Sequence, residues 1–263
     1  MTSFVSRIVI AAAGIPIVLG LVYLGGWWLF ALAAVAATIG LHEFWLLTRP
    51  LRPLAPAGYV GSILALVGAE VAGIDWMIGG FMTTLALAFC LKVISEARQA
   101  ATASIGATTL GAAWIGVGLS FLVLIRELPE HGRLALFTVM LAVWAGDTFA
   151  YFGGRLIGRH KMAPTTSPGK TWEGFVVGSL ATVFVAFVAL YKQDFLSIAE
   201  SIVLGLVLVV AAPAGDLFES LLKRDMQVKD TGRLLGGHGG VLDRVDALLF
   251  AGPAAYFTIL ALT

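Results

Sequence analysis

Acidic, basic and hydroxyl side chains that could carry out phosphate chemistry gather near the C-terminal end of the sequence. Asp216, Glu219, Ser220 and Lys223 follow one another at intervals of three, one and three residues, so on a continued helix they would share one face. Asp243 and Asp246 are also three residues apart and would be neighbours on a second helix. The spacing therefore predicts two helices that each present acids from one side.

Carboxylates that converge in a small volume repel one another unless a cation lies among them. Hard oxygen ligands of this kind suit Mg²⁺, which usually takes one or two carboxylates and completes its shell with water and substrate phosphates. Basic residues that suit phosphate oxygens lie among the acids, namely Lys223, Arg224, Lys229 and Arg244. The glycine-rich run 236–240 would let backbone N–H groups approach a phosphate closely. Together these features predict phosphoryl or nucleotidyl transfer, whereas a solvated basic loop would leave the acids unexplained.

Asp147 lies about half-way along an otherwise apolar segment, and ionisable groups at membrane depth usually mark function. A structural alternative is a buried acid satisfied by Thr148 and a neighbouring helix. The functional interpretation is favoured because Asp147 leads into Tyr151, Gly153, Gly154 and Arg155 on the cytoplasmic side. For His42 and Glu43, near the end of an earlier apolar segment, structural pairing and a place in the site both remain open.

The sequence Gly169-Lys170-Thr171 looks like the end of a phosphate-binding P-loop, G-x-x-x-x-G-K-[ST]. The first glycine of that motif would fall on Pro164, and no predicted strand precedes it, so a P-loop is excluded. Lys170 and Thr171 remain candidates for phosphate binding. We expect Trp172 to anchor the chain at the membrane interface rather than to stack on a base.

The elements that position these residues are predicted to be membrane-spanning helices. Of the 263 residues 59% are hydrophobic and only 13% are charged, against about 25% charged residues in soluble domains. Apolar segments of about 20 residues suit spanning helices and are too long for barrel strands. Nine segments qualify, at approximately 6–24, 27–47, 57–73, 76–95, 107–125, 134–154, 173–191, 198–218 and 241–262. The predicted fold is an all-α polytopic membrane bundle.

The positions of the lysines and arginines predict its orientation, because cytoplasmic segments are enriched in both. With nine spans and the N-terminus inside, fourteen of the 17 basic residues fall inside and three fall outside. The C-terminus is then outside, and the chain is a multi-pass protein of the cell (inner) membrane with its active site facing the cytoplasm. The first apolar run is expected to be a retained span rather than a cleaved signal peptide.

The organisation along the chain is expected to be an N-terminal group of transmembrane helices, 1–130, and a C-terminal catalytic region, 131–263. Two cytoplasmic loops, 155–172 and 219–240, belong to the second region. The net charge of +1 gives no reason to expect nucleic-acid binding. The single cysteine, Cys90, excludes a disulfide framework and is expected to serve packing.

The C-terminal pattern resembles the signature of the phosphatidate cytidylyltransferases (CDP-diacylglycerol synthases). The matching residues are Ser220-Leu-Leu-Lys223-Arg224, Lys229-Asp230-Thr-Gly232 and Gly236-Gly-His238-Gly239-Gly240-Val-Leu-Asp243-Arg244-Val-Asp246. Upstream, Gly146-Asp147-Thr148, Tyr151-Phe-Gly153-Gly-Arg155 and Ser167-Pro168-Gly169-Lys170-Thr171-Trp172-Glu173-Gly174 are similar to that family as well. The family often has lysine at the position of Gly169. The resemblance covers about 140–250.

The resemblance implies that CTP and phosphatidic acid react to give CDP-diacylglycerol and pyrophosphate. It also implies a dependence on Mg²⁺, membrane lipid as the surrounding phase, and a homodimer. The phosphate of phosphatidic acid, with a second pKa of about 6, is largely a dianion at neutral pH and needs no general base to attack the α-phosphorus of CTP. The site must therefore supply cations and in-line positioning.

From this chemistry we predict a role for each candidate residue. The predicted metal ligands are Asp216, Asp243 and Asp246, with Asp147 orienting a basic residue or a second cation. The predicted catalytic residues are Asp147, Asp216, Lys223, Asp243 and Asp246. The predicted substrate-binding residues are Ser220, Arg224, Lys229, Asp230, His238, Gly239, Gly240, Arg244, Lys170, Thr171 and Arg155.

Two alternatives differ in function from this hypothesis. Another membrane transferase, such as a CDP-alcohol phosphotransferase, would carry its own pattern of aspartates with Asp-Gly and Ala-Arg elements, and that pattern is absent from the sequence. A secondary transporter would place charges near the membrane midplane in two related halves. Here the charges cluster at one face and in the C-terminal half.

Overall fold

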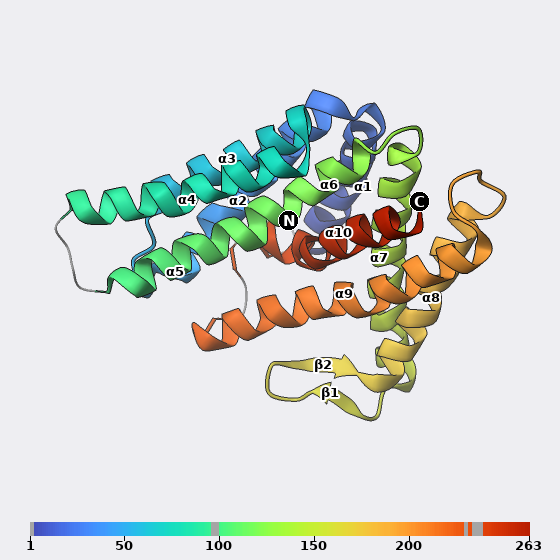
Figure 1. Ribbon diagram of the computed structural model, residues 1–263. Helices are drawn as coiled ribbons and strands as arrows, with labels where there is room; N and C mark the ends of the chain where they lie inside the picture. The colour runs from blue at the N-terminus through green and yellow to red at the C-terminus, as the bar shows by residue number, and fades with distance from the viewer. Residues whose placement is uncertain (1–2, 96–99, 229–230, 233–238) are drawn as a thin grey trace. The chain divides into compact units, whose positions relative to one another are not determined.

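A computed structural model describes residues 3–95, 100–228, 231–232 and 239–263, and they are almost entirely helical (Figure 1). The α-helices are α1 (Ser3–Leu24), α2 (Gly26–Leu47), α3 (Ala55–Ala72), α4 (Ile74–Ile94), α5 (Ala101–Gly111), α6 (Gly118–Arg126), α7 (Gly132–Ile157), α8 (Trp172–Leu190), α9 (Ile198–Asp225) and α10 (Leu242–Leu262). A π-helical segment, Ala112–Val117, joins α5 and α6 into one continuous helix. A short 3₁₀ turn, Arg49–Leu51, follows α2.

Among the described residues, eight helices are long and apolar enough to cross a membrane. They are α2, α3, α4, the continuous α5–α6 helix, α7, α8, α9 and α10. Helix α1 occupies the place of the first predicted span, and its described apolar part is Gly14–Leu24. The prediction of an all-α, multi-pass membrane protein is confirmed, while the orientation of the termini stays a prediction.

The chain divides into two compact units. Unit 1 comprises residues 1–127 and 226–245, and unit 2 comprises 128–225 and 246–263. Helix α10 therefore begins in unit 1 and continues into unit 2. The units alternate along the chain, so each is built from segments that are distant in sequence.

The core of unit 1 forms where α2 packs against α3 and the continuous α5–α6 helix. Phe44 of α2 is fully buried and lies edge-on to the ring of Trp114, with ring centroids 5.9 Å apart. Small residues let the neighbouring backbones approach, since a Cβ at Gly111 would collide with the rings of Phe44 and Trp45. Close approach of helices at small residues is the usual way to gain packing energy in lipid.

The core of unit 2 is built by α7, α8 and α9, with the continuation of α10 against α9. A Cβ added at Gly178 of α8 would lie 2.7 Å from the Gly146 carbonyl oxygen and 2.8 Å from the Ala150 Cβ on α7. On the other side, a Cβ at Gly215 of α9 would collide with the backbone of Asp246 on α10. Glycines therefore bring α7, α8, α9 and α10 together at backbone distance.

Two short antiparallel strands, β1 (Lys161–Ala163) and β2 (Ser167–Thr171), form a hairpin between α7 and α8 (Figure 1). Lys161 pairs with Thr171 across the hairpin. Thr171 is also the N-cap of α8, because its side-chain oxygen accepts a hydrogen bond from the Gly174 N–H at 3.2 Å. The segment expected as a loop thus contains a hairpin that leads directly into a capped helix.

The tight contact at Gly178 predicts that a side chain there will loosen unit 2. Replacing Gly178 by valine should lower the free energy of unfolding by about 1–3 kcal/mol, the usual cost of overpacking. Thermal unfolding in detergent measures this loss. The control is Gly79→Val, because Gly79 is exposed and its added Cβ would meet nothing within 4 Å. Equal stability of the two variants would contradict the packing described for α7 and α8.

Candidate active site

The acids and bases of unit 2 meet around Asp216 on α9. Lys170 of β2 forms an ion pair with Asp216, with 2.8 Å between Nζ and Oδ2, and these side chains are 22% and 37% exposed. The Ser220 hydroxyl, one turn further along α9, donates to Asp216 Oδ1 at 3.3 Å. Lys170 also donates to the Pro213 carbonyl oxygen at 3.5 Å. A helix turn and a hairpin strand together hold this carboxylate.

A second group of charges follows on the same helix. Lys223 and Glu219 form an ion pair at 3.0 Å, and their side chains are 14% and 1% exposed. Glu219 also interacts with the side chain of Asp246 on α10. Helix α9 extends to Asp225 instead of ending near 218, and this added length makes both the Asp216–Ser220 and the Glu219–Lys223 contacts possible. The predicted shared face on a continued helix is confirmed.

Asp147 reaches the same region from α7. It interacts electrostatically with Asp216, Asp246 and Lys170. It also lies on the wall of a small pocket whose other lining residues come from α7, α8 and α9. That lining is mostly apolar, with Val143, Ala150, Phe175 and Pro213 among it. Unit 2 therefore brings six of the residues predicted from the sequence into one cluster.

The charge of this cluster fits a divalent cation. Four acids, Asp147, Asp216, Glu219 and Asp246, face two lysines, Lys170 and Lys223. Within the described ranges, no group of three or more His, Cys, Asp or Glu residues forms a metal-binding arrangement. Mg²⁺ needs only one or two protein carboxylates when substrate phosphates complete its shell. The donor set of unit 2 therefore fits Mg²⁺ that binds together with a phosphate substrate.

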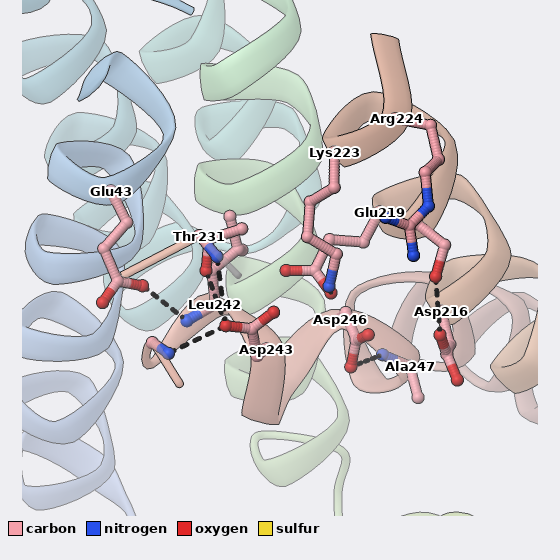
Figure 2. A network of polar contacts seen from close by, with 12 residues as sticks. Glu43, Asp216, Glu219, Lys223, Arg224, Thr231, Leu242, Asp243, Asp246 and Ala247 are labelled. Atoms are coloured by element: carbon pink, nitrogen blue, oxygen red, sulfur yellow. Dashed lines mark hydrogen bonds and ion pairs between the residues drawn. The ribbon is translucent and has the colours of Figure 1, made fainter. Parts of the chain in front are cut away.

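Asp243, in the first turn of α10 and within unit 1, has different partners (Figure 2). Its Oδ2 accepts hydrogen bonds from the Gly240 N–H at 2.8 Å, the Thr231 hydroxyl at 2.9 Å and the Thr231 N–H at 3.3 Å. Gly239 has a φ of 79°, and a Cβ there would lie 2.7 Å from the same oxygen. The Asp243 carboxylate thus holds the two described ends of the preceding loop.

Glu43 of α2 binds the same part of unit 1 from the other side (Figure 2). Its Oε1 accepts from the Val241 N–H at 3.1 Å and its Oε2 from the Leu242 N–H at 2.9 Å. The neighbouring His42 instead lies near the Tyr59 hydroxyl, 3.5 Å from its Nδ1. For Glu43 the sequence leaves two interpretations open, and only its position inside an apolar segment signals a buried role.

The other predicted residues have the following places. The Arg155 guanidinium donates to the Tyr151 hydroxyl at 3.0 Å and is exposed, and Arg224 Nε donates to the Thr166 carbonyl oxygen at 3.1 Å. Arg244 is exposed. Lys229, Asp230 and His238 lie outside the described residues. The structure thus assigns Asp147, Lys170, Asp216, Ser220, Lys223 and Asp246 to one cluster, while Asp243 and Gly240 belong to the other unit.

Comparison with known proteins places the chain among cytidylyltransferases. The family model described as Cytidylyltransferase family matches residues 5–262. A phosphatidate cytidylyltransferase of Staphylococcus haemolyticus is 35% identical over 255 residues, covering 94% of this chain and 95% of the relative. One of Synechocystis sp. is 30% identical over 285 residues, covering 97% and 96%. One of Mycobacterium tuberculosis is 32% identical over 270 residues, covering 94% and 79%. These matches confirm the resemblance that the motifs indicate.

Two basic side chains fasten the hairpin to α9, and their removal should release it. In the double variant Lys170→Gln, Arg224→Gln, the contacts to Asp216 and to the Thr166 carbonyl are lost. We expect tryptic cleavage after Lys161 in β1 to become at least about fivefold faster, since local opening controls access. The fragment masses report the cleavage site. Lys192→Gln, at an exposed residue outside the cluster, is the control, and an unchanged rate in the double variant would contradict the fastening role.

Proposed function

This chain belongs to the cytidylyltransferase family, and we propose that it transfers a cytidylyl group from CTP to phosphatidate. The products would be CDP-diacylglycerol and pyrophosphate. The relatives that match most of the chain are named phosphatidate cytidylyltransferases. The observation that carries the proposal is the cluster around Asp216, which pairs acids with lysines at the ends of apolar helices. Such a cluster is what a reaction between a lipid phosphate and a triphosphate requires.

In the proposed reaction the phosphate dianion of phosphatidate attacks the α-phosphorus of CTP. A new P–O bond forms there, and the bond from the α-phosphorus to the bridging oxygen of the β-phosphate breaks, which releases pyrophosphate. The nucleophile is already ionised near neutral pH, so the chain need not supply a general base. Its task is to bring two anions together and to align them.

Lys170 and Lys223 would supply the positive charge for this approach. In the structure both are paired with acids, so they are held in place before any substrate arrives. A lysine ammonium binds phosphate as a point charge and can exchange one anionic partner for another. We propose that Lys170 receives the phosphate of phosphatidate and that Lys223 and Arg224 receive phosphates of CTP. Preorganised cations of this kind lower the cost of charge development in the transition state.

We propose that Asp216 and Asp246 hold Mg²⁺, and that Asp147 orients Lys170 or a second cation. When bound, Mg²⁺ would neutralise phosphate charge and favour departure of pyrophosphate. Asp246 lies at the α9–α10 contact, where Glu219 interacts with it. Asp216 is held by Ser220 and Lys170. Both carboxylates are therefore oriented by other side chains of unit 2, which is the preorganisation that a metal site requires.

The proposal includes a location and an assembly. Phosphatidate carries its phosphate at the membrane interface and CTP arrives from water, so the reacting groups belong at one face of the bilayer. We place that face on the cytoplasmic side of the cell (inner) membrane, as the distribution of lysine and arginine indicates. The family resemblance further implies a homodimer, which light scattering in detergent would test.

Replacing Asp216 by asparagine should stop the proposed reaction. The amide keeps the size of the side chain but removes the charge that would hold Mg²⁺ and Lys170, so we expect kcat to fall at least about 100-fold. The assay follows radiolabelled CTP into CDP-lipid and pyrophosphate with phosphatidate and Mg²⁺ in mixed micelles. Asp75→Asn, at an exposed acid at the start of α4, is the matched control. A wild-type chain that consumes no CTP with phosphatidate would overturn the proposed function itself.

Cysteine labelling in intact cells tests the proposed orientation. In a Cys90→Ser background, single cysteines at Thr165 and Lys192 report on the hairpin and on the connection after α8, where both residues are exposed. A membrane-impermeant maleimide should label the cysteine that replaces Lys192 in intact cells. It should label the one that replaces Thr165 only after the cells are opened. The reverse pattern would place the hairpin outside and contradict the orientation.

A further inference from the structure

We infer that Glu43 is a positioning residue of this enzyme, which directs Asp243 by holding the start of α10. The catalytic meaning of this inference rests on the proposed function. The inference itself concerns contacts within unit 1, and no spacing in the sequence indicates them. Glu43 lies 199 residues from Leu242 along the chain, yet its carboxylate accepts the Leu242 N–H.

The Glu43 carboxylate is buried and bound through both oxygens. The residue is 4% exposed, and its two oxygens accept the N–H groups of Val241 and Leu242. These are among the N–H groups that a helix start leaves without an intrahelical partner. A buried carboxylate is costly unless it is hydrogen-bonded, and the positive end of a helix favours negative charge. Glu43 and the start of α10 therefore stabilise each other.

The described ends of the loop approach the Glu43 carboxylate so closely that a side chain at either glycine would collide with it. A Cβ at Gly232 would collide with Glu43 Oε1, and a Cβ at Gly240 would collide with Glu43 Oε2. The loop therefore approaches the carboxylate from both of its described ends. The closeness of Glu43 explains why glycine stands at these two positions. The local sequence of the loop alone offers no such explanation.

The backbone that Glu43 binds at the start of α10 is continuous with the backbone that Asp243 binds. The N–H groups of Val241 and Leu242 point to Glu43, while that of Gly240 points to Asp243 Oδ2. One short stretch of backbone is thus shared by two carboxylates that come from opposite ends of the chain. If Glu43 released this stretch, the turn that aims Asp243 would move with it. The competing view is that Glu43 stabilises unit 1 without any bearing on the reaction.

Replacing Glu43 by glutamine separates the two views. The glutamine amide offers one acceptor oxygen, so one of the two backbone N–H groups loses its partner. Amide hydrogen exchange in the peptide that covers 240–246 should become at least about tenfold faster. Because Asp243 is predicted to take part in the reaction, kcat should fall at least about tenfold while the KM values for CTP and phosphatidate stay within about threefold.

The matched control is Glu70→Gln, which makes the same change on α3, at a residue that has no contact with the start of α10 in the described contacts. It should leave exchange at 240–246 and kcat unchanged. Equal rates of amide hydrogen exchange at 240–246 in the Glu43 and Glu70 variants would overturn the inference. Faster exchange with an unchanged kcat would reduce Glu43 to a structural residue and equally overturn it. Both outcomes differ from failure of the proposed function, in which the wild-type chain itself lacks activity.

A double-mutant cycle tests the contact with the loop directly. Gly232→Ala should lower kcat in the wild-type chain, because its Cβ displaces the Glu43 carboxylate. In a Glu43→Ala background the same substitution should have little further effect, because the space is already free. If the fold decrease in kcat of the double variant instead equalled the product of the two single decreases, the two residues would act independently. That result would contradict the contact, since residues that touch are coupled. Thermal unfolding of each variant in detergent identifies any that does not fold.

Discussion

The structure depends on the requirement that every charge among apolar helices must find a partner. Asp147, Asp216, Glu219 and Asp246 lie on helices that are otherwise suited to lipid, where an unpaired carboxylate costs at least a few kcal/mol. Unit 2 meets this requirement with two lysines and with glycine contacts that bring the helix backbones together. In the proposed reaction, the excess of carboxylates over lysines would hold a divalent cation, and this cation would bind the phosphates together with the lysines.

Unit 1 meets the requirement in another way. Glu43 and Asp243 are satisfied mainly by backbone N–H groups at the start of α10 and in the loop before it. Lysines that are paired with acids can exchange an acid for a phosphate, whereas a carboxylate bound to a helix start is fixed in place. Of the two unit 1 acids, Glu43 holds the backbone at the start of α10, whereas Asp243 stays a predicted metal ligand.

The sequence predicts those parts of this arrangement that depend on local spacing. The lengths of the apolar segments predict the helices, and the four-residue interval predicts the contact of Ser220 with Asp216 on α9. The glycine-rich signature identifies the family, which the matches over nearly the whole chain confirm. Contacts between distant segments, such as Lys170 with Asp216 and Glu43 with Leu242, follow from the packing of helices and leave no periodic signal. The roles of Lys229, Asp230 and His238 stay predictions, as does a single site that unites Asp216 with Asp243.

The central claim is that the charge of the Asp216 cluster governs binding of a divalent cation with CTP. Mn²⁺, a paramagnetic substitute for Mg²⁺, allows this binding to be measured by electron paramagnetic resonance without turnover. The claim predicts opposite effects of two substitutions, the first measured with a non-reacting CTP analogue and the second without nucleotide. Asp216→Asn should weaken Mn²⁺ binding at least about tenfold, because a ligand is lost. Measured without nucleotide, Lys170→Met should strengthen it, because Asp216 loses its competing partner. Equal Mn²⁺ affinity in the wild-type chain and both variants would contradict the account.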